Sequence, residues 1–322
     1  MKEILMSRGA RTVVEVCAGL RKGEIALVIA DPDMLRIARV VATAVTAAGG
    51  EPMLAVMTPR RSDGQEPPAP IAAAMAKSDV FFSAVSKSIT HTQAVRDAVR
   101  AGSRGIMLTQ FTEDMFLSGG LEADFPSLAP VCRAVADAMA GAKTIRLTTP
   151  RGTDLTMCAH GRPGNALTCM VSPGQFSPVP NVEANVSPVE GSAEGVIVVD
   201  GSIPYAGIGV IREPIVVKVE KGMITSIRGG EQATMLTEAY ADKGDPLVYN
   251  VAEIGVGLNP KSRFCGIMLE DEGVFGSVHI GTGTSITLGG TVKAACHYDL
   301  IMREPSIVAD GRVILDKGKV CV

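Results

Sequence analysis

The stretch EIALVIADPDMLRIARVVATAVTAAGGEPMLAVM, residues 24–57, decides the fold class. It opens with the run EIALVIAD, whose β-branched and apolar residues predict a buried strand. An alanine-rich segment of helical period follows over Met34–Ala48, and Gly49 and Gly50 fit the C-cap that ends a helix. A second apolar run over Pro52–Met57 completes a strand, helix and strand unit, which is typical of a parallel sheet covered by helices.

The same alternation continues over roughly the first 125 residues, which therefore form an α/β domain. A Pro-rich polar segment, Arg60–Pro70, predicts a surface loop. Because Asp31-Pro32-Asp33 follows the first strand, the Gly-x-Gly-x-x-Gly turn of dinucleotide-binding proteins is missing there. The further predicted strands are Asp79–Val85 and Gly105–Thr109, and the further predicted helices are Ile71–Lys77 and Thr92–Ala101.

The second half of the chain has a mainly β texture. A helix predicted over Leu128–Ala142 leads into it, and KGMITSIRGG, with Gly222 between two strand-like runs, indicates a hairpin. We therefore expect two domains, an α/β domain over residues 1–142 and a β-rich (α+β) domain over residues 143–322 that carries the chemistry. The strands predicted in the second domain are Thr144–Thr148, Asp154–Ala159, Gly195–Asp200, Ile215–Glu220 and Met223–Arg228.

Composition excludes several classes of function. The 31 basic and 34 acidic residues are spread evenly and give a net charge of −3, so nucleic acid is not an expected partner. No apolar run reaches membrane-spanning length, and the amino terminus lacks an apolar signal core. The seven cysteines are odd in number, scattered and free of Cys-x-x-Cys spacing, which predicts reduced thiols in a cytoplasmic protein. A small-molecule or short-peptide substrate is the expected partner.

Two of the four histidines fall in the most glycine-rich part of the sequence. His279 lies in GSVHIGTGT, and His297 is followed by Tyr298 and Asp299. In an extended segment, residues two apart point to the same side, so His297 and Asp299 can converge on one ion. Such a pair suits Zn²⁺, Co²⁺, Mn²⁺ or Fe²⁺, whereas hydrogen-bonded structural roles are the alternative.

Carboxylates favour the metal interpretation. Glu253 lies in the apolar run NVAEIGVGLNP, where an unpaired carboxylate would cost several kcal/mol, so it needs a partner. Glu183 in PNVEANVSP is a second acid among small and apolar residues, or else an exposed loop residue. Asp271 and Glu272 precede His279 and form either a further acidic ligand source or a solvated turn.

These residues resemble the metal-dependent aminopeptidases of the aminopeptidase T type, over most of the chain after about Thr148. The resemblance rests on GTDL at Gly152–Leu155, EGVIVVDGSI at Glu194–Ile203, the acidic segments above, HIGTG and the final His-x-Asp. It implies two divalent ions, Zn, Co or Mn, and a homodimer. The ligands that it implies are Glu183, Glu253, His279, His297 and Asp299, with Glu272 as a further candidate.

The resemblance implies an amide or peptide hydrolase in which metal-activated water attacks the substrate, with Glu183 or Glu253 as general base. One departure concerns the tyrosine that assists catalysis in that family, because Ile286 occupies its position here.

A weaker likeness leads to the iron-dependent 2,5-dihydroxypyridine 5,6-dioxygenases. It rests on SAEG, EKGMITSIRGG, IGVGL and the final His-x-Asp. In that pattern a histidine holds the iron where this chain has Glu253, and Glu183 and His279 have no counterparts. We therefore expect the hydrolase first. The alternatives are a non-haem Fe(II) dioxygenase that cleaves a dihydroxypyridine-like ring, and a binding protein without a metal.

Overall fold

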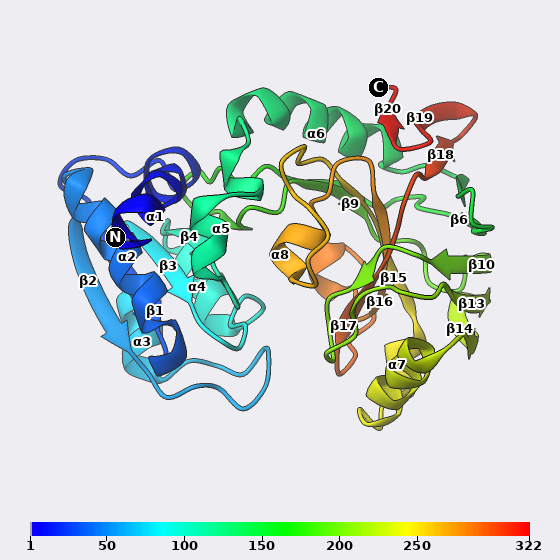
Figure 1. Ribbon diagram of the computed structural model, residues 1–322, viewed down its shortest axis with the longest axis horizontal. Coiled ribbons are helices and arrows are strands. Elements are labelled where there is room, and N and C mark those ends of the chain that lie inside the picture. The colour runs from blue at the N-terminus through cyan, green and yellow to red at the C-terminus, as the bar shows by residue number, and fades with distance from the viewer. Residues whose placement is uncertain (1) are drawn as a thin grey trace. The chain divides into compact units, whose positions relative to one another are not determined.

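The computed structural model describes residues 2–322 and has an α/β fold. The chain forms two compact units. The first joins the residues up to Pro126 with Leu167–Pro180, and the second contains Ser127–Ala166 and Asn181–Val322. The chain thus returns once to the first unit after entering the second. In Figure 1 the first unit runs mainly from blue to cyan, and the second mainly from green to red.

A five-stranded parallel sheet forms the centre of the first unit, in the order β2-β1-β3-β4-β8. The strand predictions for this half are confirmed, apart from small shifts at the ends. The last strand, β8, comes from the returning segment and was not foreseen in the sequence. The strands are β1 (Ile25–Ala30), β2 (Glu51–Val56), β3 (Val80–Ala84), β4 (Arg104–Met107) and β8 (Phe176–Pro178).

Helices cover this sheet on both faces. Leu27 and Phe81 of the strands pack with Met75 of α3 and Val95 of α4 in one buried cluster. The alternate side chains of β1 point to the opposite face, where α2 packs against β1, β2 and β3. Burial on both faces explains why β1 is an uninterrupted apolar run. The helices of this half of the chain are α1 (Lys2–Arg11), η1 (Thr12–Cys17), η2 (Pro32–Met34), α2 (Leu35–Ala47), α3 (Ala69–Met75), α4 (Gln93–Arg100), α5 (Glu113–Leu117), η3 (Gly120–Glu122) and α6 (Phe125–Met139).

The second unit contains an eight-stranded antiparallel sheet in the order β14-β13-β10-β6-β5-β18-β19-β20. The predicted hairpin is confirmed, since β13 pairs with β14. Lys221 and Gly222 both have positive φ, 49° and 74°, as a tight hairpin turn requires. The strands are β5 (Ile145–Thr148), β6 (Asp154–Met157), β10 (Glu194–Val199), β13 (Ile215–Glu220), β14 (Met223–Arg228), β18 (Ser306–Ala309), β19 (Arg312–Asp316) and β20 (Lys319–Val320).

A seven-stranded sheet in the order β12-β11-β17-β16-β15-β9-β7 carries most of the residues predicted to bind metal. Among residues 2–322, no helix combines the length and the apolar character needed to cross a membrane. The strands are β7 (Gly164–Leu167), β9 (Glu183–Val186), β11 (Ser202–Ile203), β12 (Gly209–Val210), β15 (Val251–Gly257), β16 (Val278–Gly283) and β17 (His297–Met302). The remaining helices of the unit are α7 (Glu231–Ala241), η4 (Pro246–Tyr249), α8 (Met268–Asp271) and η5 (Ile286–Leu288).

Candidate metal centre

The central strands of the seven-stranded sheet bring the predicted metal ligands onto one face. Residue 255 lies opposite Asn185 and His279, and residue 281 lies opposite Glu253 and Asp299. Directly opposed residues and residues two apart share a face, so these side chains all project from the same side. The ligands that share this face are Glu183 on β9, Glu253 on β15, His279 on β16, and His297 and Asp299 on β17.

Two glycines make room for the imidazole rings. A Cβ atom at Gly255 would lie 2.0 Å from Nε2 of His279, and one at Gly281 would lie 2.6 Å from Nε2 of His297. Neither glycine has a positive φ, so space and not backbone conformation requires glycine here. The glycine-rich sequence around the histidines is therefore part of the site.

The ligand atoms form two groups that share Glu253. One group is Glu183, Glu253 and His279, the other is Glu253, His297 and Asp299, and in each the candidate ligand atoms lie within 4.8 Å of one another. Nε2 of His297 is 2.9 Å from Oε2 of Glu253 and 3.3 Å from Oδ1 of Asp299. Nε2 of His279 is 3.6 Å from Oε1 of Glu183 and 3.9 Å from Oε1 of Glu253.

The charge of the cluster is unbalanced. Glu183, Glu253, Glu272 and Asp299 are each at most 6% exposed. In the described part of the chain, the ion pairs of these four carboxylates involve only histidines, and no lysine or arginine lies within 4.0 Å of them. Even with both imidazoles protonated, four ionised carboxylates would leave two excess negative charges. A buried site of this kind needs protons or a cation.

The pKa values show how the cluster holds protons without a cation. Burial, reinforced by neighbouring negative charge, raises the pKa of Glu183 and raises that of Glu272 further. Burial would lower the pKa of His279, but the charge of Glu183 outweighs it and holds this pKa well above its usual value. Burial would also raise the pKa of Glu253, yet the two imidazoles lower it to about 2. A bound cation would take the place of these protons, because metal ligands must be deprotonated.

A buried atom without a hydrogen-bond partner indicates where a cation fits. Among the described residues, Oδ1 of Asp299 is such an atom and lies 3.3 Å from Nε2 of His297. Nδ1 of His279 also has no partner, but Nε2 is the atom of that ring that faces Glu183 and Glu253. Nδ1 of His297 lies 2.8 Å from the carbonyl oxygen of Thr284, an acceptor that holds the proton on Nδ1 and leaves Nε2 to face the carboxylates. Carboxylate oxygens and imidazole nitrogens are ligands of divalent transition metals. The cluster is suited to hold a divalent cation.

Two asparagines, which the sequence analysis did not single out, hold the acids. Nδ2 of Asn185 donates to Oε1 of Glu183 at 2.5 Å, and Nδ2 of Asn181 donates to its Oε2 at 2.8 Å. Asn181 also reaches Oε2 of Glu272 at 3.2 Å. Glu272 lies outside the two groups, although it touches their partners. Polar residues at every second position, Asn181, Glu183 and Asn185, were a period-two signal that could have revealed this arrangement.

Burial decides between the alternatives left open for the acids. Glu183 is 3% exposed and lies on a strand, so it is not an exposed loop residue. Asp271 is fully buried and accepts hydrogen bonds from the backbone N–H groups of Cys265 and Gly266. The acidic segment at 270–272 is therefore a buried part of the structure and not a solvated turn.

A tyrosine far away in sequence completes the cluster. The hydroxyl of Tyr205 is 2.8 Å from Oε1 of Glu272 and 2.8 Å from Oδ2 of Asp299. A phenol donates only one hydrogen, so a proton on Glu272, whose pKa is raised, is needed for the other contact. Ile286, at the position of the missing family tyrosine, is 49% exposed. No local pattern around Tyr205 indicated this role.

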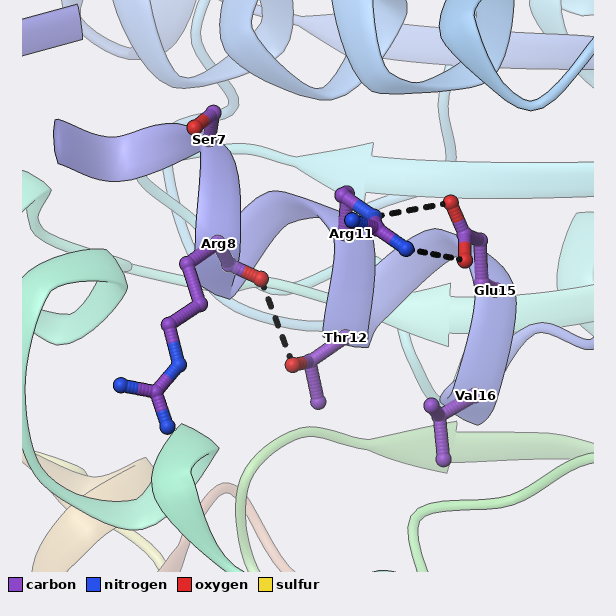
Figure 2. A pocket seen from close by; sticks show the side chains of 6 residues that line it. All are labelled: Ser7, Arg8, Arg11, Thr12, Glu15 and Val16. Atoms are coloured by element: carbon purple, nitrogen blue, oxygen red, sulfur yellow. Dashed lines mark hydrogen bonds and ion pairs between the residues drawn. The ribbon is translucent and has the colours of Figure 1, made fainter. Parts of the chain in front are cut away.

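Two surface hollows lie outside the cluster. One, of about 290 Å³, is formed by α1 and η1, and Figure 2 shows that Arg11 there is bonded to Glu15. Another, of about 460 Å³, is lined by residues that include Phe264 and Arg303, whose guanidinium lies 4.2 Å from the phenyl centroid. Neither hollow contains a residue of the carboxylate and histidine cluster.

The comparisons with known proteins cover different shares of the chain. A family model described as 2,5-dihydroxypyridine 5,6-dioxygenase matches residues 8–322. The 2,5-dihydroxypyridine 5,6-dioxygenase of Pseudomonas putida is 32% identical over 158 residues, which are 46% of this chain and 45% of that protein. The matched stretch thus spans less than half the length of that relative.

Two solved structures have a similar fold. The 2,5-dihydroxypyridine dioxygenase of Pseudomonas putida has a TM-score of 0.82 at 18% identity, covering 99% of this chain and 98% of the other. Wild-type AmpT of Thermus thermophilus has a TM-score of 0.70 at 16% identity, with full coverage of both chains. At these identities the likenesses show the fold alone.

The expectation of an amide or peptide hydrolase, aminopeptidase or metalloprotease is wrong. The family match and the sequence relative both support the dioxygenase alternative. The error has a physical cause, since carboxylates and imidazoles in this arrangement are suited to hold a cation but do not determine which reaction it would serve. The resemblance to the dioxygenases, given second place in the sequence analysis, is the stronger one.

Proposed function

The chain belongs to the 2,5-dihydroxypyridine 5,6-dioxygenase family, and we propose that it is a non-haem metal dioxygenase that opens a dihydroxylated pyridine-type ring. The observation that carries the proposal is the family match over residues 8–322, which contains every residue of the buried cluster. In the reaction, the ring bond between C5 and C6 breaks and both atoms of O₂ enter the product. The ring is oxidised and O₂ is reduced without a further reductant.

The group of Glu253, His297 and Asp299 is the proposed iron site. Ferrous iron bound there would supply the redox chemistry that lets O₂ react with the ring. The group differs from the common set of two histidines and one carboxylate, because it offers one imidazole and two carboxylates. His279 and Glu183, which share Glu253 with it, are the proposed ligands of a second divalent ion, Zn, Co or Mn. Glu272 is proposed to lie beside the metal ligands and to change the net charge of the cluster by gaining or losing a proton.

The residues around the site are proposed to accept protons from the substrate and to exclude water. A dihydroxylated ring must lose hydroxyl protons as it meets a cation, and Glu183 or Glu253 is the proposed acceptor. Glu183 is the better base of the two, because its pKa is raised whereas the imidazoles lower that of Glu253 to about 2. The two asparagine amides fix both oxygens of Glu183, so its orientation is set before substrate arrives. Burial of the cluster keeps water away from the reacting atoms.

The test uses metal-free protein reloaded anaerobically with Fe²⁺ and mixed with 2,5-dihydroxypyridine and O₂. We expect one O₂ consumed per ring opened, and a product mass that rises by two heavy oxygens with ¹⁸O₂. His297→Ala should lower the rate by about a hundredfold or more. His160→Ala is the matched control, because this exposed histidine lies outside the cluster. No oxygen uptake by fully iron-loaded protein, or uptake unchanged in His297→Ala, would contradict the proposal.

A further inference from the structure

The two oxygens of Asp299 have different surroundings. Oδ2 is 2.8 Å from the hydroxyl of Tyr205. Oδ1 is buried without a hydrogen-bond partner and lies 3.3 Å from Nε2 of His297. A carboxylate can rotate and exchange its oxygens, so a fixed donor on one of them decides which oxygen faces the histidine.

Tyr205 is built to be such a fixed donor. It follows β11, and its ring stacks on the ring of Tyr298 with centroids 5.0 Å apart and planes at 26°. Its hydroxyl has a second partner, Oε1 of Glu272, at 2.8 Å. A stacked ring with two contacts at its hydroxyl has little freedom, so the hydrogen bond to Asp299 keeps one geometry.

We propose that Tyr205 is a positioning residue that holds Oδ2 of Asp299 and thereby leaves Oδ1 free to bind the cation together with His297 and Glu253. The proposal rests on the metal-binding part of the proposed function and adds a residue to it. It does not depend on the reaction that the metal serves. Tyr205 acts through Asp299 and needs no contact with the substrate.

The experiment compares two variants that each lose one phenol hydroxyl. Tyr205→Phe keeps the ring but removes the donor to Asp299. Tyr240→Phe is the matched control, because the hydroxyl of this buried tyrosine is 2.6 Å from Oγ1 of Thr282 and has no carboxylate partner among residues 2–322. Metal-free protein is titrated with Co²⁺ against a chromophoric chelator, and the absorption spectrum of the bound Co²⁺ is recorded.

We expect Tyr205→Phe to raise the Co²⁺ dissociation constant by about 10- to 100-fold, as removal of a residue that orients a metal ligand typically does. The absorption bands should shift in the same variant. Tyr240→Phe should stay within about twofold of the unsubstituted protein, since it orients no ligand. The melting temperatures of the metal-free proteins are measured in parallel. If Tyr205 had a merely structural role, Tyr205→Phe would lower the melting temperature without changing the affinity for Co²⁺.

Three outcomes would overturn the inference: an unchanged dissociation constant in Tyr205→Phe, equal losses in both variants, or no Co²⁺ binding by the unsubstituted protein. The proposed function fails differently. Iron-loaded protein that binds metal but consumes no O₂ refutes the dioxygenase and leaves the role of Tyr205 standing.

Discussion

At the scale of single residues, two glycines provide the space that the imidazole rings of the candidate site occupy. Gly255 and Gly281 lie on the same face as the proposed ligands, and the rings of His279 and His297 occupy the space above them. A methyl group at either position would overlap an imidazole, which is buried in the case of His279. Protein interiors are close-packed, so the added methyl group could not be accommodated without a shift. We expect the histidine side chain to move and the strand to stay in place.

Gly255→Ala should therefore weaken metal binding more than it weakens the fold. We expect at least a tenfold higher dissociation constant for Co²⁺, because displacement of a ligand by about 1 Å removes its contribution to the site. Gly230→Ala is the control, since the atoms nearest to its added Cβ are those of the carboxylate end of the exposed Glu213. Equal affinities of the two variants, measured by chelator competition, would show that the space above Gly255 is not needed for His279.

At the scale of elements, the connection between β16 and β17 positions His297, a proposed metal ligand. Glu190 accepts hydrogen bonds from the backbone N–H and the hydroxyl of Thr291, both at 2.8 Å, and pairs with Arg162. Arg162 also donates to the carbonyl oxygen of Gly289. These contacts of Glu190 and Arg162 hold the segment that begins at Thr284. The carbonyl oxygen of Thr284 orients the ring of His297.

Glu190→Gln should lower the free energy of unfolding by about 1–2 kcal/mol at pH 7, because hydrogen bonds to a charged group are lost. Burial would raise the pKa of Glu190, but its own backbone amide, Thr291 and the charge of Arg162 outweigh this and lower it. The stabilisation by the ionised form is thus complete above the usual glutamate pKa. It disappears as the pH falls through the lowered value.

Urea unfolding of both proteins from pH 7 to pH 3 should show the difference between them shrinking as the pH falls. Glu238→Gln on α7 serves as the control, since this glutamate is exposed. A difference that stays constant over the whole pH range would mean that the charge of Glu190 contributes nothing.

At the scale of the whole molecule, the chain is divided into two compact units. Every residue of the carboxylate and histidine cluster belongs to the second unit. The first unit has its own parallel sheet and its own buried core. Cation binding should therefore stabilise the second unit directly, because the ligands are separate in the unfolded chain.

A divalent cation at a hundred times its dissociation constant should add about 2.7 kcal/mol to the stability of the unit that binds it. Hydrogen exchange with and without Co²⁺ should show slower exchange in β9, β15, β16 and β17. Exchange in β1 and β3 of the first unit is the internal control and should not change. Equal slowing in both units would show that they unfold together, and slowing in neither would refute cation binding.

The sequence by itself determined the local geometry. The run at residues 24–57 specified a strand, helix and strand unit because burial on both faces needs a continuous apolar strand. His297 and Asp299 were placed on one side because strand side chains alternate with period two. The convergence of Glu183, Glu253 and His279 came from the family resemblance and not from any local rule. The homodimer and the ligand roles remain predictions.

Only the tertiary structure decided which distant residues meet. Tyr205 and Asp299 are 94 positions apart, and the packing of β11 beside β17 brings them together, which no local pattern encodes. The same holds for β8, which completes the parallel sheet from a segment beyond α6. The class of reaction could not be read from the ligands, because similar carboxylates and imidazoles hold cations for different chemistries. Long-range contacts depend on the whole fold, whereas periodicity depends only on the backbone of each strand.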